Sequence, residues 1–103
     1  MAKGYWIASV DVNDPEGYKQ YIAENRVAFC KYGARYVTRG GKSEVVEGKG
    51  RSRIVVLEFK DFATALACYQ SREYSKAMAI RQRAAAADVI IVEGYDGPQP
   101  TEE

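Results

Sequence analysis

Two segments of the chain predict β-strands that are apolar on both of their faces. Residues 53–60 read RIVVLEFK, and residues 88–94 read DVIIVEG. Successive side chains of a strand point to opposite faces of the sheet, so both faces of each strand carry apolar residues. An uncovered apolar sheet face is unusual in a soluble monomer. The chain therefore needs a sheet that is covered on both sides.

Three other segments also have strand character. Residues 4–12 and 34–39 are rich in β-branched and aromatic side chains, which predicts two further strands. Residues 43–47 predict a short strand or hairpin arm, and the glycine-rich residues 48–50 predict the turn that follows it. The basic side chains beside this turn, Lys49, Arg51 and Arg53, are expected to lie in solvent.

Two helical segments separate these strands. Asp14 is a typical N-cap, Gly33 is a typical left-handed C-cap, and apolar side chains recur every three or four positions between them. Asp61 is expected to cap the second helical segment. That segment is interrupted just before Ser71, which acts as a new N-cap for a helix over residues 72–87.

The order of these elements is β-α-β-(β)-β-α-β, which predicts an α+β fold. It is the ferredoxin-like βαββαβ arrangement, an antiparallel sheet with two helices on one face. A second copy of the chain is expected to cover the other face, sheet against sheet, giving a homodimer. The alternative is a monomer whose C-terminal tail covers that face. We expect one domain over residues 1–96 and a flexible tail over residues 97–103.

Composition excludes several classes of function. The net charge of +1 and the scattered basic residues argue against a nucleic-acid or membrane partner. No apolar run is long enough for a membrane span, and residues 1–12 lack the pattern of a signal peptide. Cys30 and Cys68 are expected to be free thiols in a cytoplasmic protein.

The chain contains no histidine. This removes the commonest general base, the commonest metal ligand and the usual haem ligand. The glycine clusters, Gly40-Gly41 and residues 48–50, lack the spacing of a phosphate-binding loop. We therefore expect no metal and no cofactor.

Several motifs resemble one known family. They are residues 32–41 (YGARYVTRGG), 58–59 (EF), 65–74 (ALACYQSREY) and 91–94 (IVEG), with Arg81 between the last two. Together they resemble the family called domain of unknown function 1330, over nearly the whole chain.

This resemblance implies a dimeric α/β barrel, a superfamily that includes cofactor-free monooxygenases, muconolactone-type isomerases and haem-binding chlorite dismutases. One fold hosts many chemistries, so the resemblance implies no particular reaction. The family often has tryptophan at the position of Cys68 and glycine at that of Ala34. A smaller side chain at position 68 would reshape a pocket there, so substrate preference is not carried over.

Glu58 is the candidate catalytic residue. It lies between Leu57 and Phe59 in a predicted buried strand, and desolvation of a carboxylate raises its pKa toward the range of a general acid or base. The alternatives are a structural ion pair with a strand arginine, for which Arg39 is a candidate, and a strand-end residue in water.

The other candidates are polar or aromatic residues on helix faces that should meet the sheet. Arg81 could clamp a ligand carboxylate, or it could extend to solvent over an apolar stem. A cluster of tyrosines suits either a pocket for a small ligand or the edge of the core. The predicted ligand-binding residues are Arg39, Arg81, Tyr69, Tyr74, Tyr18, Asn25 and Arg26.

Two functional hypotheses remain open. The first is a small-molecule pocket between helices and sheet, with cofactor-free proton-transfer or monooxygenase-like chemistry if the protein is an enzyme. The second is a non-catalytic dimeric ligand-binding or assembly domain. If a partner covers one sheet face, the pocket lies on the helix side, where Glu58, Arg81 and Tyr74 are expected to converge.

Overall fold

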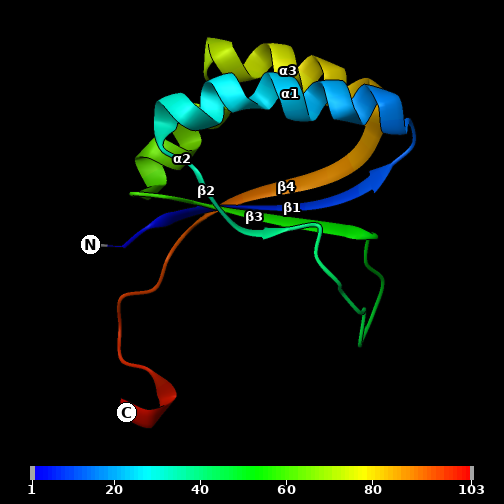
Figure 1. The fold of residues 1–103 in the computed structure, drawn as a ribbon. Helices are drawn as coiled ribbons and strands as arrows, with labels where there is room; N and C mark the ends of the chain where they lie inside the picture. The colour runs from blue at the N-terminus through cyan, green and yellow to red at the C-terminus, as the bar shows by residue number, and fades with distance from the viewer. Residues whose placement is uncertain (1, 103) are drawn as a thin grey trace.

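The computed structural model describes residues 2–102. All long helices lie on one side of a single sheet (Figure 1). In chain order the elements are β1 (Gly4–Val12), α1 (Pro15–Tyr32), β2 (Arg35–Arg39), β3 (Arg53–Phe59), α2 (Phe62–Tyr69), α3 (Arg72–Ala84), β4 (Ala85–Glu93) and a 3₁₀ turn (Pro100–Glu102).

The sheet has the strand order β2-β3-β1-β4, and every neighbouring pair is antiparallel. Its two central strands, β1 and β3, are therefore far apart in sequence and adjacent in space. Each of the two βαβ halves crosses over on the helix side. The predicted α+β, ferredoxin-like class is confirmed.

The predicted helix boundaries follow from side-chain caps. The Asp14 carboxylate accepts a hydrogen bond from the Gly17 amide, and Gly33 ends α1 at a φ of 69°, in the left-handed region that favours glycine. The Asp61 carboxylate caps α2 in the same way. The Ser71 hydroxyl accepts from the Tyr74 amide at 3.0 Å, so the predicted break between α2 and α3 is confirmed.

Two predicted elements are wrong. Residues 43–47 form no strand and lie in an exposed loop between β2 and β3. Residues 85–87 belong to β4 and not to the preceding helix, because they pair with residues 10–12 of β1. The Ala84 carbonyl accepts the amides of Asn13 and Asp14, which ends α3 at that residue. Pairing with β1 thus overrides the helix propensity of the alanine run.

The inner face of the sheet, which the helices cover, consists of three rows of side chains across β3, β1 and β4. Trp6 and Val10 are almost fully buried, and Ala8 lies between them with part of its surface exposed. Since Ala8 is small, the middle row leaves space under the helices. The rows are Leu57–Trp6–Ile91, Val55–Ala8–Val89 and Arg53–Val10–Ala87.

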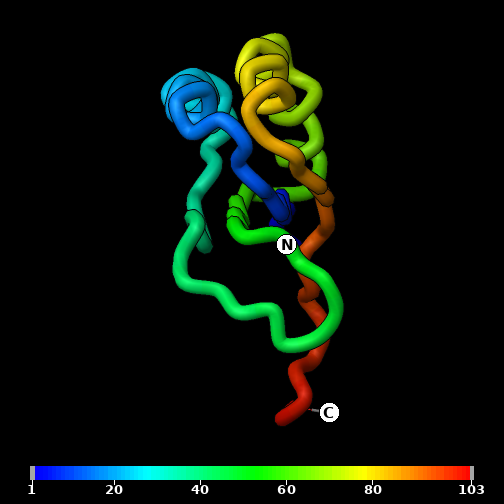
Figure 2. Tube along the Cα trace, turned by 90° about the vertical axis from the view of Figure 1, so that its right-hand side faces the viewer, coloured from blue at the N-terminus to red at the C-terminus, as the bar shows by residue number. Residues whose placement is uncertain are grey.

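The outer face carries no helix. Its middle row is Val56–Ile7–Ile90, in which Ile7 is 40% and Ile90 60% exposed. Both faces of β3 and β4 are therefore apolar at their centres, as predicted. The β2–β3 loop and the chain beyond β4 both extend past this open face (Figure 2).

The chain beyond β4 ends in the short 3₁₀ turn. Flexibility of residues 97–102 stays a prediction, and residue 103 lies outside the described residues. None of the helices within residues 2–102 has both the length and the apolar character needed to cross a membrane.

Candidate functional site

A cavity lies between the helices and the inner face of the sheet. It contains about 470 Å³ of empty space, partly open to solvent, and the centre of a water molecule can reach about 30 Å³ of it. Its base is the middle row around Ala8. The lining residues are Trp6, Ala8, Val10, Tyr18, Tyr21, Ile22, Asn25, Phe29, Tyr36, Arg39, Arg53, Val55, Leu57, Tyr74, Arg81 and Val89.

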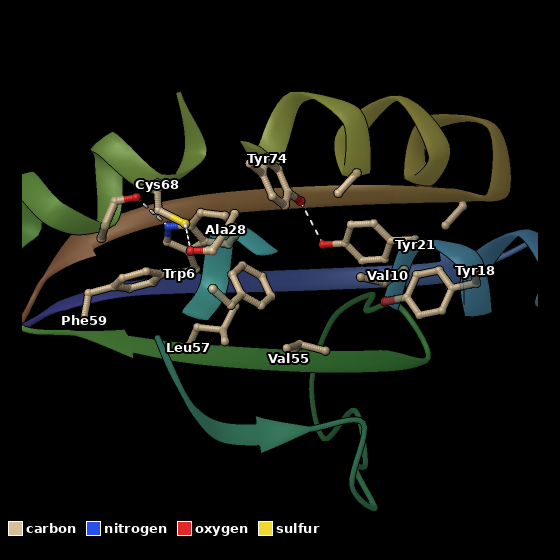
Figure 3. Close-up of a cluster of buried hydrophobic side chains, with 14 of the residues drawn as sticks. Trp6, Val10, Tyr18, Tyr21, Ala28, Val55, Leu57, Phe59, Cys68 and Tyr74 are labelled. Carbon is tan, nitrogen blue, oxygen red and sulfur yellow. Dashed lines mark hydrogen bonds between the residues drawn. The ribbon is translucent and has the colours of Figure 1, made fainter. Parts of the chain in front are cut away.

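Two phenols meet at this cavity. The hydroxyl oxygens of Tyr21 on α1 and Tyr74 on α3 lie 2.8 Å apart in a buried hydrogen bond (Figure 3). Burial raises the pKa of both hydroxyls, while the nearby charge of Arg81 acts in the opposite direction. Both phenols are therefore neutral at physiological pH, and the one whose O–H is not used in their mutual hydrogen bond can donate a hydrogen bond to a ligand.

Three buried polar atoms near these phenols have no hydrogen-bond partner in the described part of the chain. They are Asn25 Oδ1, Arg53 Nε and Arg81 Nε, and all three residues line the cavity. Asn25 is 3% and Arg81 6% exposed, so bulk water does not satisfy them. Such groups are rare in folded proteins and call for an explanation at each position.

The charged side chains that line the cavity are all positive. Arg39, Arg53 and Arg81 line it, and no aspartate or glutamate does. None of the ion pairs between described residues involves these arginines. Arg39 lies over the ring of Tyr36 at 4.3 Å, and Arg53 over that of Tyr18 at 5.4 Å.

Glu58 lies elsewhere. It is on the outer face of β3, whereas Arg81 and Tyr74 are on the helix side, so the predicted convergence of these three residues is wrong. Successive side chains along β3 point to opposite faces of the sheet. Since Leu57 faces the cavity, its neighbour Glu58 faces away from it. The predicted partner Arg39 is also too far along the sheet. Arg39 pairs with Val55.

The carboxylate of Glu58 has other partners. Its oxygens lie 3.4 Å from Lys3 Nζ and 3.9 Å from Arg35 Nη1, and it accepts the Tyr5 hydroxyl at 3.3 Å. This arrangement matches the structural ion pair that was one alternative interpretation of Glu58.

The structure divides the remaining predicted residues. Tyr18 and Asn25 line the cavity, with Arg39, Arg81 and Tyr74. Tyr69 packs against the rings of Trp6 and Tyr74 and is outside the lining. Arg26 lies in a neighbouring groove along α1.

Sequence reasoning missed Arg53 and Ala8 as site residues, while Tyr21 was expected only as one of the tyrosines that face the sheet. Arg53 was expected in solvent, but its position opposite Val10 places it on the inner face, with Nε buried. The detectable signal was the alternation Trp6, Ala8, Val10 along β1, which puts one small side chain between two large ones on the face that the helices cover.

Neither cysteine lines the cavity, although Cys30 lines the neighbouring groove along α1. Cys68 is fully buried, and desolvation raises the pKa of its thiol to about 12, so this thiol stays protonated and unreactive. Within residues 2–102, no three side chains of the metal-binding types gather into a cluster.

Solved structures with this fold were found. A protein of unknown function from Rhodopseudomonas palustris is 16% identical with a TM-score of 0.73, covering 93% of this chain and 85% of that one. SnoaB, a cofactor-independent oxygenase from Streptomyces nogalater, is 8% identical with a TM-score of 0.61 and full coverage of both chains. A dimeric ferredoxin-like protein of unknown function from Thermobifida fusca is 18% identical with a TM-score of 0.52, covering 89% of each chain.

At these identities the structural neighbours establish the fold alone. No curated protein matches the sequence. The sequence profile of domain of unknown function 1330, by contrast, matches residues 3–95, which is nearly the whole chain. The chain therefore belongs to the family described as domain of unknown function 1330.

Proposed function

We propose that the protein binds a small organic molecule in the cavity between helices and sheet. The observation that carries this proposal is that Asn25 Oδ1, Arg53 Nε and Arg81 Nε, all buried and without a partner, line the same cavity. A buried polar group without a partner costs about 1–3 kcal/mol. A ligand that supplied the missing hydrogen bonds would recover this energy.

The chemistry that suits the cavity is hydrogen-bond donation to a bound oxygen that gains negative charge. The Tyr21–Tyr74 pair offers a neutral O–H, and Arg81 supplies a buried positive charge beside it. Donors and charges held in place around a developing oxyanion are a strong source of catalysis. Such a site can stabilise an enolate or phenolate without a cofactor. SnoaB, described as a cofactor-independent oxygenase, provides a precedent on the same fold.

A non-catalytic binding protein is the second candidate. It is favoured by the absence of aspartate, glutamate and histidine from the cavity lining, which leaves no conventional general base there. If the protein is not an enzyme, the same residues bind and orient a ligand that is released without chemical change.

The proposal includes a homodimer built through the outer sheet face. The row Val56–Ile7–Ile90 is apolar and solvent-accessible in the single chain, and a second copy related by a two-fold axis would cover it. The Thermobifida fusca protein of this fold is described as dimeric. Because the cavity lies on the opposite face, dimerisation would leave it free.

The cysteines favour the cytoplasm as the site of action. Cys30 is exposed, Cys68 is buried, and both are free thiols. Free thiols persist in reducing compartments, so we place the proposed binding function there.

A metabolite screen by ligand-observed NMR tests the proposal. Ala8→Leu fills the base of the cavity and should abolish binding of every hit that uses it. Ala79→Leu places the same side chain on the exposed side of α3 and should leave binding unchanged. Hits that bind both variants equally, or no hits at all, would contradict the proposal.

Turnover of a confirmed ligand separates the two candidates. In an enzyme, Tyr74→Phe removes the hydrogen-bond donor but not the ring, so turnover should fall while affinity changes little. If the ligand is returned unchanged by the unmodified protein under all conditions in which it binds, the non-catalytic candidate is correct.

A further inference from the structure

We infer that the ligand of this cavity is an organic carboxylate with a flat apolar body, which enters with its carboxylate first through the groove between α1 and β2. This inference rests on the proposed small-molecule function and adds the chemical class and the direction of entry. Three observations carry it: the shape of the groove, the charges along it, and the unpartnered atoms at its inner end.

The groove adjoins the cavity. It runs between α1 and the segment that leads into β2, and the centre of a water molecule can reach about 590 Å³ of it. Ile22, Phe29, Tyr36 and Arg39 line both the groove and the cavity, so the two spaces share a wall, and the groove is the proposed entrance. The large space lies outside and the small one inside, which suits a ligand with a small head and a larger body.

Cationic side chains follow this path from its mouth to its end. Lys19, Arg26 and Arg39 line the groove, and Arg53 and Arg81 line the cavity beyond it. Neither lining contains an aspartate or glutamate, although the whole chain has a net charge of only +1. A path lined by charges of one sign concentrates ligands of the opposite sign and speeds their association.

Lys19 differs from the others in having a partner. Its ammonium group lies 3.4 Å from Glu16, and both side chains are largely exposed. Exposed pairs of this kind are weak and screened by salt. Arg39, Arg53 and Arg81 therefore provide the positive charge that a ligand would meet beyond the mouth.

The inner end suits a carboxylate. The space of about 30 Å³ that water centres can reach in the cavity exceeds the roughly 10–15 Å³ that one water needs, so there is room for the oxygen atoms of a carboxylate. The Nε–H groups of Arg81 and Arg53 are donors without acceptors. Arginine and carboxylate form strong charge-assisted hydrogen bonds, often in pairs. A neutral head group would leave the charge of Arg81, a largely buried side chain, without compensation.

The walls of the groove suit a flat body. Phe29 and Tyr36 meet edge to face with their ring centres 6.2 Å apart, and Arg39 stacks on Tyr36. The short side chains of Ala23 and Ala34 also line the groove and leave room for a ligand ring. Aromatic rings and a guanidinium plane are the surfaces on which another ring stacks.

The third buried atom without a partner, Asn25 Oδ1, is a hydrogen-bond acceptor. A hydroxyl beside the carboxylate would donate to it. The probe should therefore be an aromatic hydroxy acid, and 3-hydroxy-2-naphthoate has the head, the hydroxyl and the flat body in one molecule. Its amide, 3-hydroxy-2-naphthamide, keeps the shape and removes the negative charge.

Fluorescence titration of the full chain with both probes tests the inference. The acid should bind about tenfold more tightly than the amide, and its advantage should shrink as salt is added. Arg39→Gln, at an exposed position that does not threaten folding, removes both a charge and a stacking surface, so it should weaken binding of the acid more than that of the amide. Arg81→Met should abolish the preference. Arg83→Gln removes an exposed charge from α3 outside both linings and serves as the control.

Each other result has a defined meaning. If the amide binds as well as the acid, and Ala8→Leu abolishes both, the carboxylate inference is overturned while the proposed function stands. If the acid binds but Arg39→Gln and Arg81→Met do not affect it, the inference is again overturned, because binding occurs elsewhere. If neither probe binds and the metabolite screen yields nothing that Ala8→Leu blocks, the proposed function fails and the inference fails with it.

Discussion

The Tyr21 and Tyr74 hydroxyls lie 2.8 Å apart and join α1 to α3 directly above the sheet. Tyr21 is 8% and Tyr74 1% exposed, so the hydrogen bond is shielded from water. The same contact thus holds the two helices together and delimits the cavity. Any change to it should alter both the stability of the fold and the chemistry of the site.

Tyr74→Phe should lower the free energy of unfolding by about 1–2 kcal/mol. The substitution keeps the ring contacts with Trp6 and Phe29 but leaves the Tyr21 hydroxyl with one partner fewer in a buried position. Tyr21→Phe should cost a similar amount for the same reason. Urea unfolding followed by circular dichroism measures both values.

The double variant decides whether this hydrogen bond is the cause. If it is, the two substitutions should be non-additive by at least about 0.5 kcal/mol, as expected for residues in contact. Tyr95→Phe is the control, since Tyr95 is exposed and bonds only to the carbonyl of Pro98. Strict additivity of the Tyr21 and Tyr74 effects would refute the coupling.

Stability should fall in alkaline solution because these tyrosines are buried. Desolvation raises the pKa of Tyr74 and of Tyr21 above the ordinary value of 10.0, so the unfolded chain loses these protons first as pH rises. The stabilisation is complete below about pH 10 and is lost above it, by about 1.4 kcal/mol per pH unit for each tyrosine.

Urea unfolding between about pH 8 and about pH 11 measures this slope. Tyr74→Phe should reduce the slope of the unfolding free energy against pH by the contribution of one proton, about 1.4 kcal/mol per pH unit. The difference in slope between the two proteins separates Tyr74 from the lysines that titrate in the same range. Equal slopes for both proteins would show that Tyr74 ionises as freely in the folded state as in the unfolded one.

Most of the fold could be predicted from the sequence because its signals are local. Caps such as Asp14 and Ser71 fix helix starts within one turn, and alternation identifies strands. The errors arose where contacts between residues far apart in the sequence determine the secondary structure. The alanines at 85–87 favour a helix on their own, but β1 pairs with them, whereas residues 43–47 pair with no strand in the described chain.

The candidate site was predictable only in part. Arg81, Tyr74 and Asn25 were identified because helix periodicity places them against the sheet. Glu58 was misplaced because its strand is apolar on both faces, so its pattern alone does not tell which face the helices cover. Register with β1 resolves this, since Glu58 pairs with Tyr5 and Leu57 with Trp6.

Glu58→Gln should leave ligand binding unchanged. Its carboxylate lies on the far side of the sheet from the cavity, among Lys3, Arg35 and Tyr5. Both ion-pair partners are largely exposed, so the loss of stability should stay below about 1 kcal/mol. Titration with 3-hydroxy-2-naphthoate, compared with Arg81→Met, provides the measurement. A loss of affinity as large as that of Arg81→Met would restore Glu58 to the site.

Ile90→Asp should convert the proposed dimer to a monomer. Ile90 is 60% exposed in the single chain and belongs to the apolar row at the centre of the outer face. A two-fold axis through that face would bring two aspartates into one desolvated interface, where unpaired carboxylates cost several kcal/mol. Light scattering after size-exclusion chromatography should report a mass near twice 11.5 kDa for the unmodified protein and near 11.5 kDa for the variant.

Val27→Asp is the matched control for this experiment. Val27 is 55% exposed on α1, on the other side of the molecule from the outer sheet face, so the same new charge should leave the dimer intact. The Ile90→Asp monomer should still bind the naphthoate probe, because the cavity lies on the helix side of the sheet, away from the outer face. A monomeric mass for the unmodified protein would refute the dimer without affecting the cavity. Loss of probe binding in a folded monomer would instead mean that the partner subunit helps to form the site.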